Sequence, residues 1–178
     1  NARIAVGGGD DTLVGGDGND QIEDSGIGRN ILLGGRGMDT IIAGDGNDTI
    51  RGNEDNDNIL AGGGADTVYG DAGSDTIRGG AGDDLIYGGV DNDTIYGDTN
   101  NDTIYGEAGN DTVDGGADND VIYGGDNDDT LSGGAGTDTL NGDAGNDRIR
   151  GDAGNDTIRG GIGIDFLLGG ADADTLYG

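Results

Sequence analysis

The stretch GGAGTDTLN at residues 133–141 is one copy of a nine-residue pattern that decides the fold of this chain. With its aspartate taken as position six, the pattern fills residues 6–14 and 15–23. After one inserted residue, it continues over residues 25–177 in unbroken register, which makes 19 units in all. A fixed nine-residue period predicts a solenoid of the parallel β-helix kind.

Each position of the unit makes its own structural demand. Position eight is Ile, Leu or Val in every unit, so we expect it to point inward from a three-residue strand over positions seven to nine, with six-residue turns between strands. Position four is Gly, Asp or Asn, which predicts a positive φ. At position two, Glu107 indicates either that a positive φ is not strictly required or that its unit is strained.

Two departures from the pattern lie close together. Asp24 is inserted between two units, and Asn30 replaces the aspartate at position six of the following unit. We therefore expect an irregular coil there.

The other 18 units carry aspartate at position six, and these residues are the candidate metal ligands. An isolated aspartate in a glycine turn commonly bonds to its own backbone, whereas 18 in register favour a ligand role. The candidates are Asp11, Asp20, Asp39, Asp48, Asp57, Asp66, Asp75, Asp84, Asp93, Asp102, Asp111, Asp120, Asp129, Asp138, Asp147, Asp156, Asp165 and Asp174.

The chemistry of this ligand set favours calcium. Calcium takes six to eight oxygen ligands in flexible geometry, whereas magnesium demands a stricter geometry and should substitute poorly. The chain has no His and no Cys, so zinc and copper sites are not expected.

Composition supports folding that depends on a cation. The net charge is −29, from 37 acidic residues against eight arginines, and the chain has 44 glycines. Such charge with few aromatic residues is typical of disorder, but the regular repeat is not. Both observations are explained if the chain is disordered without a cation and folded with one.

Composition also bears on other functions. The acidic surface argues against nucleic-acid binding, and no apolar run is long enough to span a membrane. The absence of His removes His-based catalytic triads and zinc-protease motifs. We therefore predict a non-catalytic segment.

The pattern Gly-Gly-x-Gly-x-Asp-x-aliphatic-x resembles the RTX, or haemolysin-type, calcium-binding family over essentially the whole chain. The resemblance implies an all-β fold, a right-handed parallel β-roll with two units per coil and two parallel sheets. Calcium would lie between the turns of unit i and unit i+2, held by position-six carboxylates and turn carbonyls. Seventeen such pairs exist, two of which include Asn30, so we expect roughly 15 calcium ions, whose charge balances the −29 of the chain.

The resemblance also implies secretion by bacteria through type I export and folding outside the cell. Residues 1–178 are interpreted as a single array whose two ends fall inside a repeat, and hence as a segment of a longer array. The first hypothesis is a calcium-binding structural segment of a secreted surface protein, adhesin or extracellular filament. The alternative is a calcium-triggered folding and secretion module of an RTX toxin or secreted hydrolase.

The outward positions offer a weaker alternative, which is binding of ice or glycan. Tyr69, Tyr87, Tyr105 and Tyr123 are spaced by 18 residues and should form one column, with Tyr96 on the opposite sheet. A matching threonine column is expected on that opposite sheet, formed by Thr76, Thr94, Thr112 and Thr130. The tyrosine column could contact a surface glycan or a neighbouring copy, or simply stiffen the roll by cross-strand stacking. Further repeats or copies could also join end to end.

Overall fold

A computed structural model describes residues 1–178 as twenty short strands joined by turns. The strands form two parallel ten-stranded sheets, and strands that follow each other along the chain alternate between them. The odd sheet contains β1 (Arg3–Val6), β3 (Gln21–Asp24), β5 (Thr40–Ile42), β7 (Asn58–Gly63), β9 (Thr76–Ala81), β11 (Thr94–Thr99), β13 (Thr112–Ala117), β15 (Thr130–Ala135), β17 (Arg148–Ala153) and β19 (Phe166–Ala171). The even sheet contains β2 (Thr12–Asp17), β4 (Ile31–Arg36), β6 (Thr49–Glu54), β8 (Thr67–Ala72), β10 (Leu85–Val90), β12 (Thr103–Ala108), β14 (Val121–Asp126), β16 (Thr139–Ala144), β18 (Thr157–Ile162) and β20 (Thr175–Tyr177).

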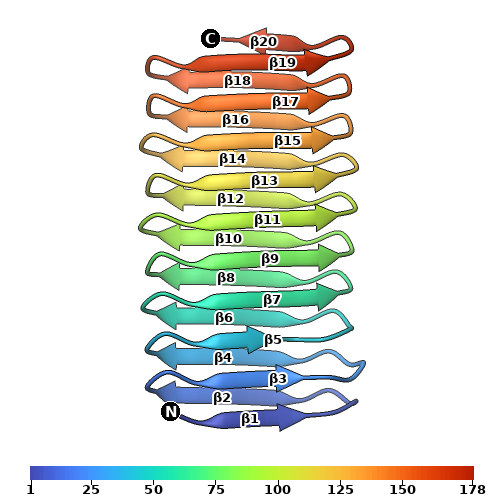
Figure 1. The fold of residues 1–178 in the computed structure, drawn as a ribbon, viewed down its shortest axis with the longest axis vertical. Helices are drawn as coiled ribbons and strands as arrows, with labels where there is room; N and C mark the ends of the chain where they lie inside the picture. Colours follow the sequence, from blue (N-terminus) through green and yellow to red (C-terminus); the bar gives the residue numbers. More distant parts are fainter.

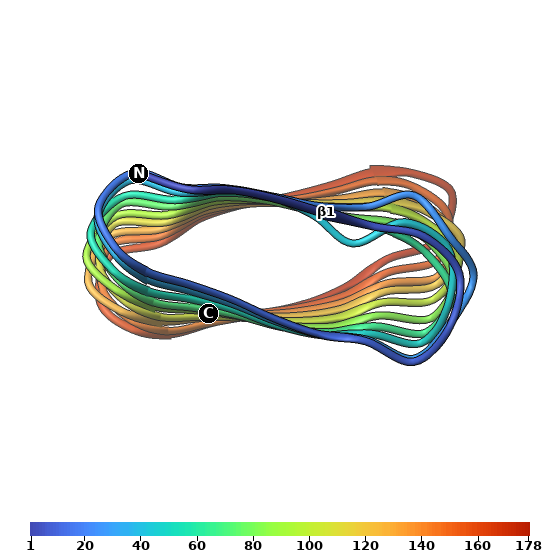
Figure 2. The ribbon, with the colours of Figure 1, turned by 90° about the horizontal axis from the view of Figure 1, so that it is seen from below.

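The chain winds into a rod in which two units make one coil (Figure 1). Strands pair with the strand one coil away, in a register such as Ile86 with Ile104. Seen along the rod axis, the coils superpose into a flattened ring whose two long walls are the two sheets (Figure 2). The predicted parallel β-roll is therefore confirmed. The structure contains no helix long and apolar enough to cross a membrane.

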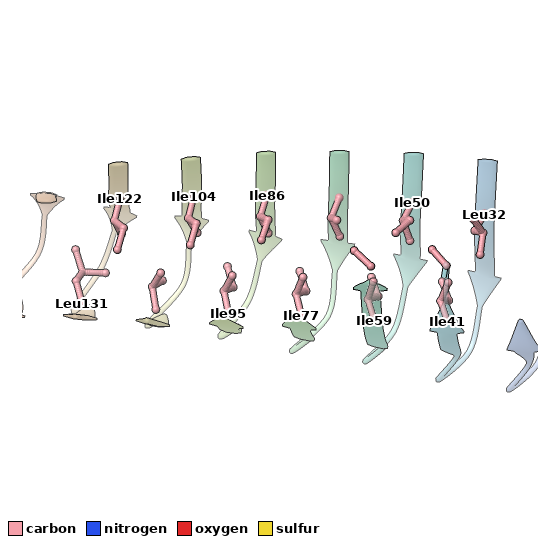
Figure 3. Packing of buried hydrophobic residues seen from close by; sticks show 14 of the residues in the cluster. Leu32, Ile41, Ile50, Ile59, Ile77, Ile86, Ile95, Ile104, Ile122 and Leu131 are labelled. Atoms are coloured by element: carbon pink, nitrogen blue, oxygen red, sulfur yellow. The ribbon is translucent and has the colours of Figure 1, made fainter. Parts of the chain in front are cut away.

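A single column of aliphatic side chains from each sheet fills the space between the walls (Figure 3). Position eight supplies nearly all of it: Ile86 and Ile104 come from the even sheet, Ile77 and Ile95 from the odd sheet, and all four are fully buried. The inward direction predicted for position eight is confirmed. The core nevertheless contributes only about one large side chain per nine residues, which is little apolar burial to offset the entropy of ordering a glycine-rich backbone.

The predicted lengths of strand and turn are wrong. Most strands have six residues and include positions one to three of the next unit, so only positions four to six remain as a turn. The pairing between strands continues through positions one to three, where, for example, Val90 pairs with Ala108. The reason is that identical coils stack in register. The backbone therefore continues its hydrogen bonds to the next coil through the glycine-rich positions that follow positions seven to nine.

Positive φ is confirmed at position four and holds at position two as well. At position four, every Asp and Asn has φ between 75° and 82°; these are Asp55, Asp91, Asn100, Asp118, Asn127 and Asp172. At position two, Glu107 has a φ of 77°, so the strained alternative is the correct one there. A left-handed backbone costs a residue with this side chain about 1–2 kcal/mol.

The irregular coil expected near Asp24 is also confirmed. Strand β5 has only three residues, and the neighbouring chain makes isolated bridges from Asp45 to Ile27 and Gly63 in place of a continuous strand. Gly26 and Gly28 occupy positions two and four of this unit, yet neither has the positive φ found at those positions in the other units, where Gly7 in the first unit is the one further exception.

Candidate metal centres

The position-six aspartates form two columns, because units one coil apart lie directly above one another. Their side chains turn into the rod, where those from Asp20 to Asp156 are at most 4% exposed. Asp11, Asp165 and Asp174 are half-buried. The structure thus brings the candidate ligands together in pairs one coil apart, which is 18 residues, or 19 across the insertion between Asp20 and Asp39. This is the arrangement that the family resemblance implies.

One oxygen of each carboxylate is fixed by the backbone. The Oδ1 atom accepts a hydrogen bond from the position-six N–H of the preceding coil, as in the bond from Asp84 N–H to Asp102 Oδ1 at 2.9 Å. The next bond in this column runs from Asp102 N–H to Asp120 Oδ1 at 2.8 Å. These bonds orient every carboxylate in the same way along the rod.

The other oxygen has no hydrogen-bond donor. Fifteen Oδ2 atoms are buried without a partner, and they belong to Asp20, Asp39, Asp48, Asp57, Asp66, Asp75, Asp84, Asp93, Asp102, Asp111, Asp120, Asp129, Asp138, Asp147 and Asp156. An unpaired buried carboxylate oxygen is costly, and folded proteins retain such atoms where an ion, a proton or a water supplies the partner. The repetition of one such atom in unit after unit indicates a repeated ligand.

The surroundings of each Oδ2 atom supply more oxygen. A methyl group added at Gly106 would lie 2.5 Å from Asp111 Oδ2 and 2.5 Å from the carbonyl oxygen of Gly124, one coil further on. The carboxylate oxygen and the backbone carbonyl therefore converge on the small space that glycine leaves open at position one. Oxygen atoms of these two kinds are the ligands that calcium prefers.

Acidic side chains alone would not complete such a site. No group of three or more of them lies close enough together to hold a metal ion. A cation between two coils would therefore draw most of its six to eight ligands from backbone carbonyls and water.

The burial of these carboxylates changes their acidity. The pKa of Asp93 and Asp102 is raised from 3.8 to about 8, mainly by burial and also by carboxylates in neighbouring coils, while the hydrogen bond from the backbone opposes the shift. Burial likewise raises the pKa of Asp57 and Asp66 to about 7. Each carboxylate therefore strongly favours a bound positive charge, whether a proton or a metal ion.

Asn30 takes the same place in its column but presents different atoms. Its Oδ1 accepts a hydrogen bond from Asp11 N–H at 2.9 Å, as an aspartate there would. Its amide nitrogen stands where the other units have the unpaired oxygen, and donates to Asp24 Oδ2 at 2.7 Å.

A second set of columns was not predicted from the sequence. At position five, Asn92 Oδ1 accepts from Asn110 N–H at 2.7 Å, and Asn110 Oδ1 accepts from Asp128 N–H at 3.0 Å. These exposed side chains link successive turns without any metal. The signal was present, since Asn directly precedes the position-six aspartate in many units.

The outer faces agree with the predicted columns. Tyr69, Tyr87, Tyr105 and Tyr123 stack with ring centroids 4.9–5.0 Å apart and planes within 8° of parallel. The guanidinium of Arg51 covers the free face of Tyr69 at 4.0 Å. Because the stacked faces contact one another, the column offers ring edges and hydroxyls to a partner and does not offer a flat aromatic platform.

The opposite sheet carries the threonine column. Thr76, Thr94, Thr112 and Thr130 pair in register along it, as predicted. Tyr96 lies on this sheet between Arg78 and Asp114, without a tyrosine neighbour.

Comparison with known proteins gives a family match across the chain. A family model described as RTX calcium-binding nonapeptide repeat (4 copies) matches in overlapping segments that run from residues 1–23 and 24–59 to residues 150–178. No curated protein matches the sequence significantly.

Proposed function

Because the chain belongs to the RTX calcium-binding nonapeptide-repeat family, we propose that it is the calcium-binding structural segment of a secreted bacterial surface protein, adhesin or extracellular filament, and that it folds when it binds calcium outside the cell. Residues 1–178 act as one array in this proposal. The observation that carries it is the series of fifteen buried Oδ2 atoms without a partner.

The proposed ligands are the position-six aspartates from Asp11 to Asp174, together with backbone carbonyls such as that of Gly124 beside Asp111 Oδ2. Calcium supplies positive charge to carboxylates that burial has made unfavourable as free anions. One ion between each regular pair of units one coil apart accounts for roughly 15 ions, close to the number that neutralises a charge of −29.

Folding is coupled to this binding in the proposal. The core is narrow, the backbone contains 44 glycines, and ordering glycine is entropically expensive. Burying unneutralised carboxylates adds to that cost. The metal-free chain therefore stays unfolded at neutral pH, and calcium binding supplies the missing free energy.

The proposed extracellular location is based on the calcium affinity that such a module needs. Extracellular calcium-binding modules need dissociation constants of only about 10⁻⁴–10⁻³ M, and calcium at such concentrations is available outside the cell. The same chain would remain unfolded, and so able to pass through an export channel, at cytosolic calcium concentrations.

The test is a calcium titration followed by far-UV circular dichroism, with magnesium as the control ion. We expect a steep transition from coil to β-structure with calcium alone. Stable β-structure in excess chelator at neutral pH would rule out folding on calcium.

A matched pair of variants tests the ligand assignment. Asp102→Asn keeps an oxygen to accept the Asp84 N–H bond but removes the charged Oδ2, so its calcium midpoint should rise several-fold. Asp118→Asn removes the same charge from the exposed position four, where Asn is found elsewhere with the same positive φ, and should leave the midpoint near that of the unaltered chain. Equal midpoints for the two variants would refute the assignment of position six.

A further inference from the structure

The coil that contains Asp24 and Asn30 satisfies its buried polar atoms in a way that no other coil does. Both side chains are at most 2% exposed, so both need partners. Neither has a side-chain atom among the buried groups without a hydrogen bond, whereas Asp20, Asp39 and Asp48 around them each do.

Asp24 has a partner for each of its two oxygens. Oδ1 accepts a hydrogen bond from Gly26 N–H at 3.0 Å, and Oδ2 accepts one from the amide nitrogen of Asn30 at 2.7 Å. A buried carboxylate with both oxygens bonded in this way needs no cation to be stable.

Asn30 keeps its column of side chains continuous without adding charge. Its Oδ1 accepts from Asp11 N–H and its own N–H donates to Asp48 Oδ1 at 2.7 Å. At the place where each neighbouring aspartate presents an unpaired oxygen, Asn30 presents a hydrogen-bond donor. The insertion of Asp24 provides the acceptor for that donor.

The backbone around this pair differs from the regular coils over the same stretch. From residue 70 onward position one is always glycine, but the column beside the insertion has Ser25, Ala43 and Ala61 there. Along the rod axis, a cyan segment in the colour range of β5 and the residues after it leaves the outline that the other coils share (Figure 2). The backbone of this coil thus accommodates the inserted residue, and the side chain of Asp24 has hydrogen-bond partners within the coil.

We propose that the Asp24–Asn30 pair is a metal-free joint, in which an amide replaces the cation and interrupts one of the two columns of calcium sites near its N-terminal end. This inference rests on the proposed function. The two pairs of units that include Asn30, with Asp11 on one side and Asp48 on the other, then bind no ion, while the regular pairs do, beginning with Asp20–Asp39 in the other column and Asp48–Asp66 in this one.

The test is to convert the joint into a site that needs an ion. Asn30→Asp places a carboxylate oxygen against Asp24 Oδ2, and two buried carboxylates at this distance repel strongly unless a cation binds between them. At saturating calcium we expect at least one more ion per chain than the unaltered protein binds, counted by elemental analysis of the dialysed protein and by native mass spectrometry.

Asn92→Asp is the matched control. It adds the same charge at the exposed position five, where Asn92 acts only as an acceptor through Oδ1 and where Asp128 shows that aspartate fits. Its ion count should equal that of the unaltered protein. An unchanged count in folded Asn30→Asp would overturn the metal-free joint.

A second variant decides the matter if Asn30→Asp does not fold. Deletion of Asp24 combined with Asn30→Asp restores an unbroken nine-residue period, and both pairs should then take up calcium, which gives two ions more than the unaltered chain. The same count as the unaltered chain would mean that those pairs already held ions, contrary to the inference. If the unaltered chain itself binds no calcium, the proposed function fails, which is a different result.

Discussion

At the scale of single residues, the two oxygens of each position-six carboxylate have different surroundings. Oδ1 accepts a hydrogen bond from the backbone of the neighbouring coil, as in the bond from Asp93 N–H to Asp111 Oδ1 at 2.8 Å. Oδ2 is left free toward the interior. The backbone bond thus orients the candidate ligand in the folded roll, where burial of its free oxygen is unfavourable as long as that oxygen has no partner.

Position one controls the space beside that free oxygen, and Gly106→Ala tests this. The added Cβ would meet both Asp111 Oδ2 and the Gly124 carbonyl oxygen at 2.5 Å, so the backbone or the carboxylate must move. We expect a loss of about 1–3 kcal/mol in the free energy of unfolding, as for other overpacked sites, together with weaker calcium binding. Urea unfolding at fixed calcium measures the first effect, and the calcium midpoint measures the second.

Gly7→Ala is the control for this prediction, because its added Cβ has no atom within 4 Å. It should change stability little. If Gly106→Ala and Gly7→Ala lower the free energy of unfolding equally, the loss does not come from the space beside the carboxylate.

The features that follow from spacing alone could be predicted at this scale. Ile104 was predicted to point inward because a strict period repeats the environment of each position, and its burial confirms this. The ligand role of Asp102 rests on the same period and stays a prediction. The partner of each carboxylate oxygen could not be predicted, since it depends on how coils are offset along the rod. The bond between Asn30 and Asp24 was missed for the same reason, although the sequence did indicate an irregular coil there.

At the scale of strands, stacking in register places equivalent side chains of successive coils above one another, so that each outward or inward position forms a column. This explains why the strands are longer than the pattern of side chains predicted: the backbone continues to pair through Gly89 and Val90 after the alternating residues have ended. Stacking in register also brings like groups together, so uncharged columns stabilise the roll, whereas columns of carboxylates place like charges close to one another.

The tyrosine column provides a measure of this uncharged contribution. Tyr105 stacks on Tyr87 and Tyr123, whereas Tyr96 has only the guanidinium of Arg78 at 5.0 Å from its ring centroid. Since a stacked pair contributes about 0.5–1.5 kcal/mol beyond its buried area, Tyr105→Ala should lower the free energy of unfolding by about 1–2 kcal/mol more than Tyr96→Ala. Urea unfolding in saturating calcium would measure both, and equal losses would show that the stacks add nothing.

At the scale of the whole molecule, the buried carboxylates make the metal-free roll sensitive to pH. Their pKa values rise on folding from 3.8 to about 6 for Asp75 and Asp84 and to about 8 for Asp93 and Asp102. A group with a raised pKa in the folded state favours folding while it is protonated. That contribution is fully present below pH 3.8 and is lost as the pH rises through about 6 to 8.

Acidification should therefore partly replace calcium. In excess chelator we expect β-structure to increase as the pH falls from 8 toward 4, and in the presence of calcium we expect ions to be released over the same range, because protons compete for the same oxygens. Circular dichroism and a calcium electrode would follow the two changes. A chain that remains a random coil in chelator at pH 4 would contradict the prediction.

Screening of charge, in contrast, should not replace calcium at neutral pH. The net charge of −29 repels itself, and 1 M sodium chloride shortens the Debye length to about 3 Å, which removes most repulsion between exposed carboxylates. The fifteen Oδ2 atoms are buried without a donor, so mobile ions in solution do not neutralise them unless an ion leaves water and is coordinated inside the roll. We therefore expect no β-structure in 1 M sodium chloride with chelator at pH 7.5, and full β-structure when millimolar calcium is added to the same sample. Folding in sodium chloride alone would mean that general repulsion, and not the absence of a coordinated ion, keeps the chain unfolded.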